Sequence, residues 1–110
     1  MTGNEYQKLA ARTIPKDKSR AELTEHALFG MVGELGEIHS IYQKQIQGHD
    51  INYDHLKKEV GDLMWFIAEF CTMNGFDLDD ILTKNITKLI ARYPEGFSSE
   101  KSLHRKEGDI

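Results

Sequence analysis

The fold is decided by residues 56–71, LKKEVGDLMWFIAEFC. Apolar side chains recur there at helical spacing and form a wide stripe, which consists of Leu56, Val60, Leu63, Met64, Ile67, Phe70 and Cys71. Asn52 is suited to cap the start of this helix, and Gly75 is suited to end it. Cys71 lies inside the stripe, so we expect it to pack as a small apolar side chain. No convincing period-two alternation predicts a strand anywhere in the chain.

Two further helices are predicted on the N-terminal side of this stretch. A long one spans residues 21–47, and its apolar side is formed by Ala27, Met31, Leu35, Ile38 and Ile41. Gly48 and Asp50 then interrupt the pattern. A short helix over residues 3–12 comes first, and Pro15 marks its end.

The C-terminal third of the chain adds a fourth helix and a tail. Asp77 can cap this helix, which runs to about Arg92 and is closed by Pro94. Residues 95–110 are polar and lack periodicity, so we expect an irregular arm that packs on a partner subunit. Four helices with short connections predict an all-α four-helix bundle in a single domain, residues 1–110.

Length and charge narrow the class of protein. A chain of 110 residues buries little surface on its own, so a dimer would help to stabilise it. The net charge of −4 argues against a protein that coats nucleic acid, which needs a basic stripe. We find no transmembrane stretch and no apolar signal core, and the single cysteine suits a reducing compartment. The sequence therefore predicts a cytoplasmic protein without membrane or nucleic-acid-polymer partners.

Two acidic pairs lie inside the apolar helical stretches, Glu34 with Glu37 and Glu59 with Asp62. Each pair is spaced i, i+3, so its carboxylates lie about 60° apart on one side of a helix. On a helical wheel Glu34 falls at the edge of the apolar arc and Glu59 falls within it. A partly desolvated carboxylate costs several kcal/mol unless it is compensated, so we expect the four acids to bind divalent metal.

The ligand chemistry points to magnesium. An all-oxygen site selects a hard cation, which makes Mg²⁺ the expected ion and Mn²⁺ a possible substitute. Di-iron helical proteins use Glu-x-x-His, and neither acidic pair has a histidine at that position. The competing interpretation is that the acids are solvated flank charges, but two pairs on neighbouring helices favour metal. Glycines beside the pairs, Gly33, Gly36 and Gly61, each cost about 1 kcal/mol of helix stability, which indicates close helix approach or ligand access.

A second polar set lies on the predicted fourth helix. Asn85, Lys88 and Arg92 are spaced i, i+3, i+7 and share one face. We expect Asn85 to be buried among apolar neighbours, and the two basic groups to hold phosphate oxygens. The alternative is a solvated basic edge that answers Asp79 and Asp80. The chain has no Gly-rich P-loop, so a P-loop nucleotidase is excluded.

These residues together resemble the MazG-like nucleotide pyrophosphohydrolases of the all-α NTP pyrophosphatase superfamily. The resemblance includes Gly48-His49 between the acidic pairs and the segment Tyr93-Pro94-Glu95-Gly96-Phe97. It extends from Asn4-Glu5-Tyr6-Gln7 and Ala11-Arg12-Thr13 to Ser102-Leu103-His104-Arg105, so it covers nearly the whole chain.

The resemblance implies cleavage of a nucleoside triphosphate between its α and β phosphates, with Mg²⁺ bound by Glu34, Glu37, Glu59 and Asp62. It also implies that Asn85, Lys88 and Arg92 contact the nucleotide. The expected assembly is a helical dimer or a dimer of dimers, with active sites near subunit contacts, and the expected role is nucleotide-pool house-cleaning.

Several features stay open at this point. The base-selecting pocket could draw on Tyr6, Arg12, Trp65 or Phe97, and the general base could be Glu34 or Glu37. Two rival functions remain. One is hydrolysis of phosphoribosyl-ATP by a small all-α enzyme, which the Tyr93–Phe97 segment disfavours. The other is a non-catalytic module that dimerises through its apolar faces.

Overall fold

All of the regular structure in this chain is helical. The computed structural model describes residues 1–110, with helices α1 (Gly3–Ala11), α2 (Arg20–Ile46), α3 (Tyr53–Met73), α4 (Leu78–Arg92) and α5 (Ser99–Leu103). The only β-type pairing is an isolated bridge between Pro94 and Gly96. The predicted all-α class is therefore confirmed. None of the helices combines the length and the apolar composition that crossing a membrane requires.

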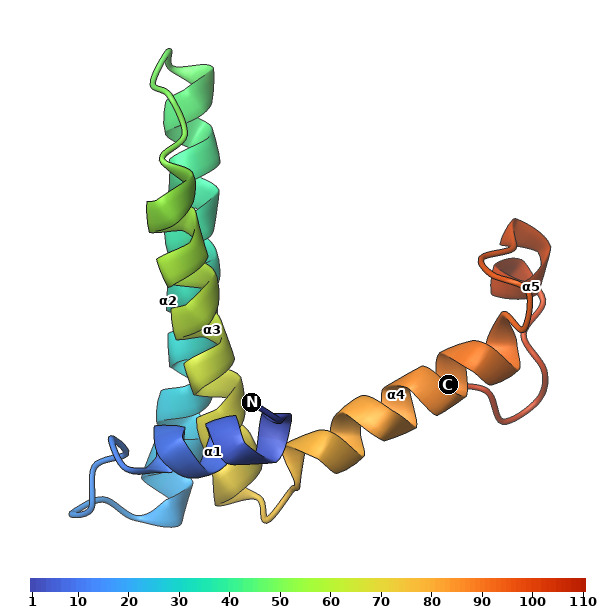
Figure 1. Ribbon diagram of the computed structural model, residues 1–110, viewed down its shortest axis with the longest axis horizontal. Helices are drawn as coiled ribbons and strands as arrows, with labels where there is room; N and C mark the ends of the chain where they lie inside the picture. The colour runs from blue at the N-terminus through green and yellow to red at the C-terminus, as the bar shows by residue number, and fades with distance from the viewer.

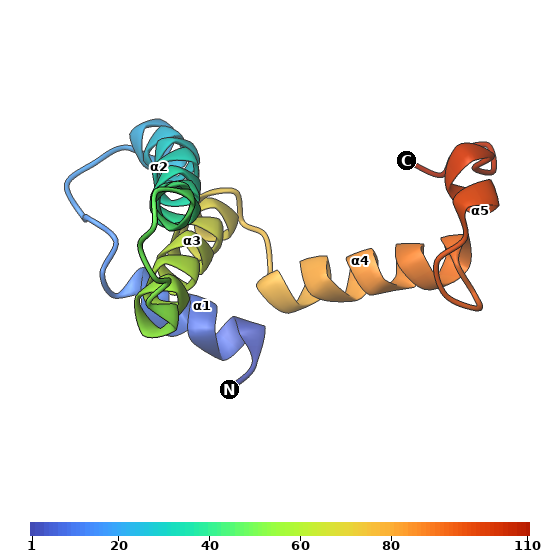
Figure 2. The ribbon, with the colours of Figure 1, turned by 90° about the horizontal axis from the view of Figure 1, so that it is seen from above.

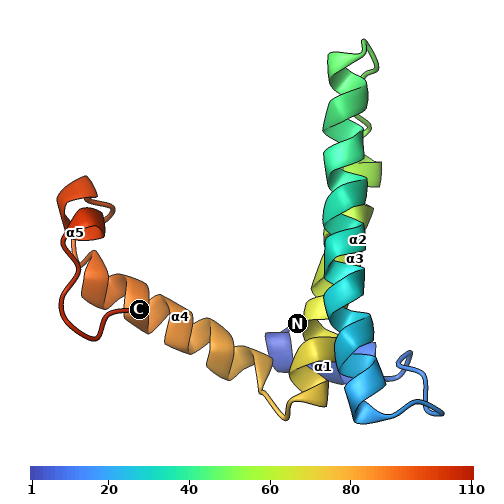
Figure 3. The ribbon, with the colours of Figure 1, turned by 180° about the vertical axis from the view of Figure 1, so that it is seen from behind.

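The two long helices α2 and α3 form a hairpin, and they lie side by side in both Figure 1 and Figure 3. Ser19 opens α2 with a capping box, in which its hydroxyl accepts from the Glu22 amide and the Glu22 carboxylate accepts from the Ser19 amide. Asn52 caps α3 as expected, since its side chain accepts from the His55 amide at 3.1 Å. With 27 residues, α2 spans about 40 Å.

The core lies at the base of the hairpin, where α1 crosses α3 (Figure 1). Its buried apolar residues are Ala10, Ile14, Leu23, Ala27, Ala68, Cys71 and Leu78. The expected core position of Cys71 is thus confirmed. Leu35, expected on the core side of α2, is instead 60 % exposed, because the upper half of α2 packs on α3 alone and leaves its outer face uncovered.

Among the glycines of α2 and α3, Gly30 is the one in tight contact with the opposite helix. A Cβ atom added there would clash with the ring of Phe66, whereas one added at Gly33 would meet nothing within 4 Å. The glycines beside the acidic pairs, Gly33, Gly36 and Gly61, all face open space, so close helix approach within the chain does not explain them. The close approach occurs one turn earlier, at a glycine that the sequence pattern did not single out.

This contrast predicts opposite effects for two alanine substitutions. We expect Gly30→Ala to lower the free energy of unfolding by about 1–3 kcal/mol, because Phe66 is also held by Trp65 and His26 and must shift. Gly33→Ala adds a methyl group in open space and should stabilise α2 by up to about 1 kcal/mol. Urea denaturation followed by circular dichroism measures both, and equal stabilities would contradict the tight packing of Phe66 on Gly30.

The start of α4 is set by side chains from α1. Asp77 has the extended backbone of an N-cap, but its side chain makes no capping hydrogen bond, contrary to expectation. The Leu78 amide donates to Gln7 Oε1 and the Asp79 amide donates to Asn4 Oδ1, each at 2.9 Å. The Gln7 amide group also donates to the Phe76 carbonyl. Because α1 supplies these acceptors, it fixes the direction in which α4 leaves the hairpin.

That direction is outward. Figures 1 and 2 show α4 projecting away from the hairpin, with α5 at its far end, and the chain measures 43 × 43 × 27 Å. The four predicted helices therefore do not close around one core within a single chain, because the main helix packing of α4 is against α1 and not against the hairpin. The segment expected to be an irregular arm contains the short helix α5, which is capped by Ser98, whose hydroxyl accepts from the Lys101 amide.

Candidate active site

Three of the four predicted metal ligands come together near the middle of the hairpin. Glu34 of α2 and Glu59 and Asp62 of α3 each offer a carboxylate oxygen, and these oxygens lie within 4.8 Å of one another. Glu34 and Glu59 are half-buried and Asp62 is exposed. Glu37, one turn further along α2, is exposed and lies outside this group. The i, i+3 spacing on α3 and the antiparallel packing of α2 account for the convergence.

The surroundings of Glu34 in this group favour its protonated form. A hydrogen bond with Glu59, partial desolvation and the negative charges of Glu59, Asp62 and Glu37 raise the pKa of Glu34 to about 7. The second carboxylate oxygen of Glu34, Oε2, is buried and has no hydrogen-bond partner. A buried anionic oxygen without a donor is unfavourable, and a cation beside it relieves the cost. The residues therefore fit a divalent ion bound by oxygen ligands.

This titration predicts that metal binding displaces a proton. Glu34 is mostly protonated below its pKa of about 7 and must lose its proton to bind a cation. We expect about one proton to be released per binding event at pH 6, a release that falls toward zero by pH 8.5, with weaker Mg²⁺ affinity at the lower pH. Calorimetric titration in two buffers of different ionisation enthalpy measures the release. A constant release across this range would contradict the assignment of Glu34.

Neighbouring side chains connect the acidic group to the rest of the hairpin. His55 lies one turn before Glu59 on α3, and its Nε2 is 3.0 Å from Glu59 Oε1. Tyr6 of α1 is close enough to the acidic group for the charge of Asp62 to act on it: burial and that negative charge both raise the pKa of Tyr6. Tyr6 was one of the candidates for the base pocket, and the structure places it on the acidic side of the hairpin.

A second polar cluster lies on the same faces of α2 and α3, closer to the core. Glu69 has a fully buried side chain, and both of its carboxylate oxygens are within hydrogen-bond distance of His26 Nδ1, at 2.9 and 3.0 Å. Trp65 packs edge-on against His26 and Phe66, and its indole N–H donates to Thr13 Oγ1 at 2.9 Å. Trp65 therefore packs within its own chain.

Sequence reasoning overlooked this cluster, although a signal was present. Glu69 is a charged residue inside an apolar run, and it follows Asp62 by seven residues, so the two share a helix face. The partner was harder to find, since His26 lies 43 positions away and its spacing matches no ligand motif.

The polar set of α4 is not brought to the acidic group within one chain. Asn85, Lys88 and Arg92 lie on α4, which extends away from the hairpin (Figure 2). Asn85 is exposed, contrary to expectation, because α4 projects away from the hairpin at this point (Figure 2). The alternative interpretation had Lys88 and Arg92 neutralise the charges of Asp79 and Asp80. Asp80 is instead paired with Lys84, whose Nζ lies 2.8 Å from its carboxylate.

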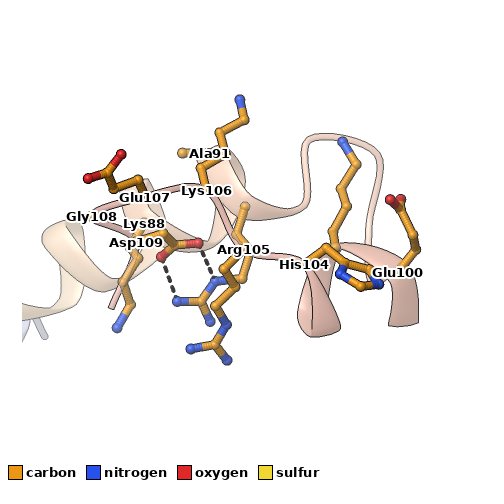
Figure 4. A pocket seen from close by; sticks show the side chains of 11 residues that line it. Lys88, Ala91, Glu100, His104, Arg105, Lys106, Glu107, Gly108 and Asp109 are labelled. Carbon is orange, nitrogen blue, oxygen red and sulfur yellow. Dashed lines mark hydrogen bonds and ion pairs between the residues drawn. The ribbon is translucent and has the colours of Figure 1, made fainter.

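Lys88 and Arg92 instead line a cavity of about 530 Å³ between the end of α4 and residues 100–109 (Figure 4). The Arg92 guanidinium donates from Nε and Nη2 to the two carboxylate oxygens of Asp109, at 2.8 and 2.7 Å. Arg92 is therefore engaged by an internal carboxylate in this structure.

Comparison with known proteins places the chain in a family. The model of the MazG nucleotide pyrophosphohydrolase domain matches residues 22–97. The chain belongs to the MazG nucleotide pyrophosphohydrolase family. Members of this family typically use a divalent metal ion, which agrees with the acidic group of α2 and α3. The MazG match includes both acidic pairs and α4, whereas α1 and residues 98–110 lie outside it.

The MazG chain is also similar to a curated phage protein. It is 32 % identical over 76 residues to the Gene 37 protein of Mycobacterium phage L5, a match that covers 64 % of this chain and 67 % of the phage protein. No solved structure matches the chain.

Proposed function

We propose that this chain is a Mg²⁺-dependent nucleoside triphosphate pyrophosphohydrolase that cleaves between the α and β phosphates and takes part in nucleotide-pool house-cleaning. The observation that carries the proposal is the convergence of Glu34, Glu59 and Asp62 around a buried, unpartnered carboxylate oxygen. Membership of the MazG family supports the same reaction class. Mn²⁺ is the expected substitute for Mg²⁺, because both ions prefer oxygen ligands.

The residues have distinct roles in this reaction. Glu34, Glu59 and Asp62 would hold the metal, which when bound polarises phosphate oxygens and lowers the pKa of a coordinated water. Water attack on a phosphorus atom of the α–β linkage breaks the bond to the bridging oxygen and yields the monophosphate and pyrophosphate.

Glu37 takes the water's proton in this scheme, since it is exposed, close enough to influence Glu34, and outside the converging group. If so, Glu37→Gln lowers kcat and leaves Mg²⁺ binding in place. A variant that loses Mg²⁺ binding would instead make Glu37 a ligand.

A nucleotide assay tests the reaction. The protein is incubated with Mg²⁺ and a panel of ribonucleoside and deoxyribonucleoside triphosphates, and the products are separated. Monophosphate and pyrophosphate support the proposal, whereas diphosphate and orthophosphate refute cleavage between the α and β phosphates. Activity confined to phosphoribosyl-ATP would favour that rival reaction. An absence of turnover with every substrate would favour a non-catalytic dimerisation module.

We further propose that the active protein is a homodimer or a dimer of such dimers. Only 8 of the 110 residues are buried in the single chain, and α4 presents an exposed apolar edge of Leu82, Ile86 and Ile90. A groove of about 540 Å³ on the outer face of α2, lined by Val32, Leu35 and Tyr42 among others, is also uncovered. A second copy would cover these surfaces and give the basic face of α4 an acidic group to approach.

The assembly is tested on α4. Ile86 is 55 % exposed, and Ile86→Glu places a charge in the proposed contact, so light scattering should report a monomer or a large rise in the dissociation constant. Thr87→Glu is the matched control, because it adds the same charge at the next exposed position of the helix. A wild-type protein that is monomeric at micromolar concentration, or equal behaviour of the two variants, would refute the assembly.

A further inference from the structure

The cavity at the far end of α4 has the lining of an anion site. Its polar wall is dominated by the cations Lys88, Arg92, Lys101, Arg105 and Lys106, which outnumber its acidic residues (Figure 4). At about 530 Å³ it is much larger than one carboxylate group. The segment that forms its outer wall, residues 98–110, lies outside the region matched by the MazG family model.

The carboxylate of Asp109 occupies the part of this cavity next to the Arg92 guanidinium. Asp109 accepts two parallel hydrogen bonds from the Arg92 guanidinium, at 2.8 and 2.7 Å, and both side chains are largely shielded from water, with 9 % and 19 % exposed. The Arg92 hydrogen bonds, followed by the charges of Arg92, Arg105 and Lys88, hold the pKa of Asp109 below its usual range. Arg92 therefore holds Asp109 directly, and the positive charges of Arg105 and Lys88 add to this attraction without an ion pair.

The geometry of that contact is not specific to a carboxylate. The planar fork of a guanidinium binds two oxygens of a phosphate in the same bidentate way. A polyphosphate carries more charge than Asp109 and would engage Lys88, Arg92 and Arg105 together. Asp109 is bound through a short non-helical segment, where Gly108 has φ 86° and the Asp109 amide donates to the Lys106 carbonyl. Because Asp109 lies outside every helix, its side chain can leave Arg92 without breaking a helix.

We propose that Asp109 is a displaceable internal anion, which occupies in the free chain the site that a di- or triphosphate group takes when ligand binds. Residues 104–109 then act as a latch on the basic face of α4, and ligand binding exchanges phosphate oxygens for the Asp109 carboxylate on Arg92. The identity of the physiological ligand as a nucleotide rests on the proposed function. The exchange itself does not.

Inorganic tripolyphosphate tests the exchange without catalysis. Isothermal titration calorimetry is carried out at low ionic strength and without divalent metal on wild type, Asp109→Asn and Glu107→Gln. Glu107 lines the same cavity and has no ion pair, so its variant removes one negative charge without opening the latch. We expect Asp109→Asn to bind about fivefold or more tightly than both other proteins, because the competing state is removed.

Each other outcome of the titration overturns the proposal. Equal affinities of Asp109→Asn and Glu107→Gln would reduce the effect to general charge, and weaker binding by Asp109→Asn would make Asp109 a contributor to the site. Absence of binding in wild type and in Asp109→Asn would remove the anion site. Arg92→Gln should bind at least about tenfold more weakly, as expected for loss of a bidentate contact, and wild-type affinity in that variant contradicts the model of exchange.

A measurement on wild type avoids dependence on the fold of a variant. In ¹⁵N NMR spectra, tripolyphosphate should shift the Arg92 Nε–H resonance and increase the solvent exchange of the Asp109 amide. Binding that leaves both signals unmoved would exclude the exchange. Because these titrations contain no nucleoside and no metal, a protein that hydrolyses no nucleotide can still give the expected result. An active enzyme can equally fail it.

Discussion

Glu59→Gln is expected to lower pyrophosphohydrolase activity by about 100-fold or more and to weaken Mg²⁺ binding, without loss of helical circular dichroism. Glu59 is a member of the converging group and shares a hydrogen bond with Glu34. Its amide replacement keeps the shape of the side chain but removes a formal charge that a hard cation requires. A contribution of several kcal/mol from the metal corresponds to roughly two decades of rate or more.

Two controls separate ligation from other effects of this change. Glu25→Gln alters an exposed glutamate on the same hairpin that forms no ion pair, and it should leave activity unchanged. His55→Asn removes the 3.0 Å contact between His55 and Glu59 without removing the carboxylate, so it should change activity by only a few-fold. Full activity in Glu59→Gln would remove Glu59 from the site. If His55→Asn lost as much activity as Glu59→Gln, the contact between His55 and Glu59, and not metal binding by Glu59, would explain the loss.

The helices and the acidic group were predictable because they depend on short-range patterns. Asn52 and Pro94 mark element ends by local chemistry, so the predicted ranges agree with α2, α3 and α4 to within one or two residues. The positions of Glu34 and Glu59 at the border of the apolar arcs required only helical periodicity and two neighbouring helices. Their convergence therefore follows from local structure plus one packing event.

The parts that sequence reasoning missed depend on contacts between distant positions. The direction of α4 is set by hydrogen bonds in which Asn4 and Gln7 accept from backbone amides about 70 residues later, and no local pattern specifies these partners. The buried Asn85 expected on α4 was wrong for the same reason, because burial there requires another helix to be present. Glu37 stays a predicted metal ligand, although it lies outside the group of three carboxylates whose oxygens are within 4.8 Å of one another.

Replacing His26 and replacing Glu69 are expected to lower the free energy of unfolding by unequal amounts. The Glu69 side chain is fully buried, whereas that of His26 is 49 % exposed, and they meet at 2.9 Å. His26→Leu leaves a buried carboxylate without its partner, which typically costs about 3–5 kcal/mol. Glu69→Leu removes the buried charge itself and leaves a histidine that water can solvate, so its cost should be about 1 kcal/mol or less.

The asymmetry is measured by urea denaturation of both variants at several protein concentrations, because assembly adds to apparent stability. We expect Glu69→Leu to exceed His26→Leu by about 2 kcal/mol or more in free energy of unfolding, and the double variant to resemble Glu69→Leu. Glu69→Gln, which keeps a hydrogen-bonding group toward His26, should lie close to wild type. If Glu69→Leu were the less stable variant, the carboxylate would be supporting the Trp65–Phe66 packing around it, and the exposed histidine would be dispensable.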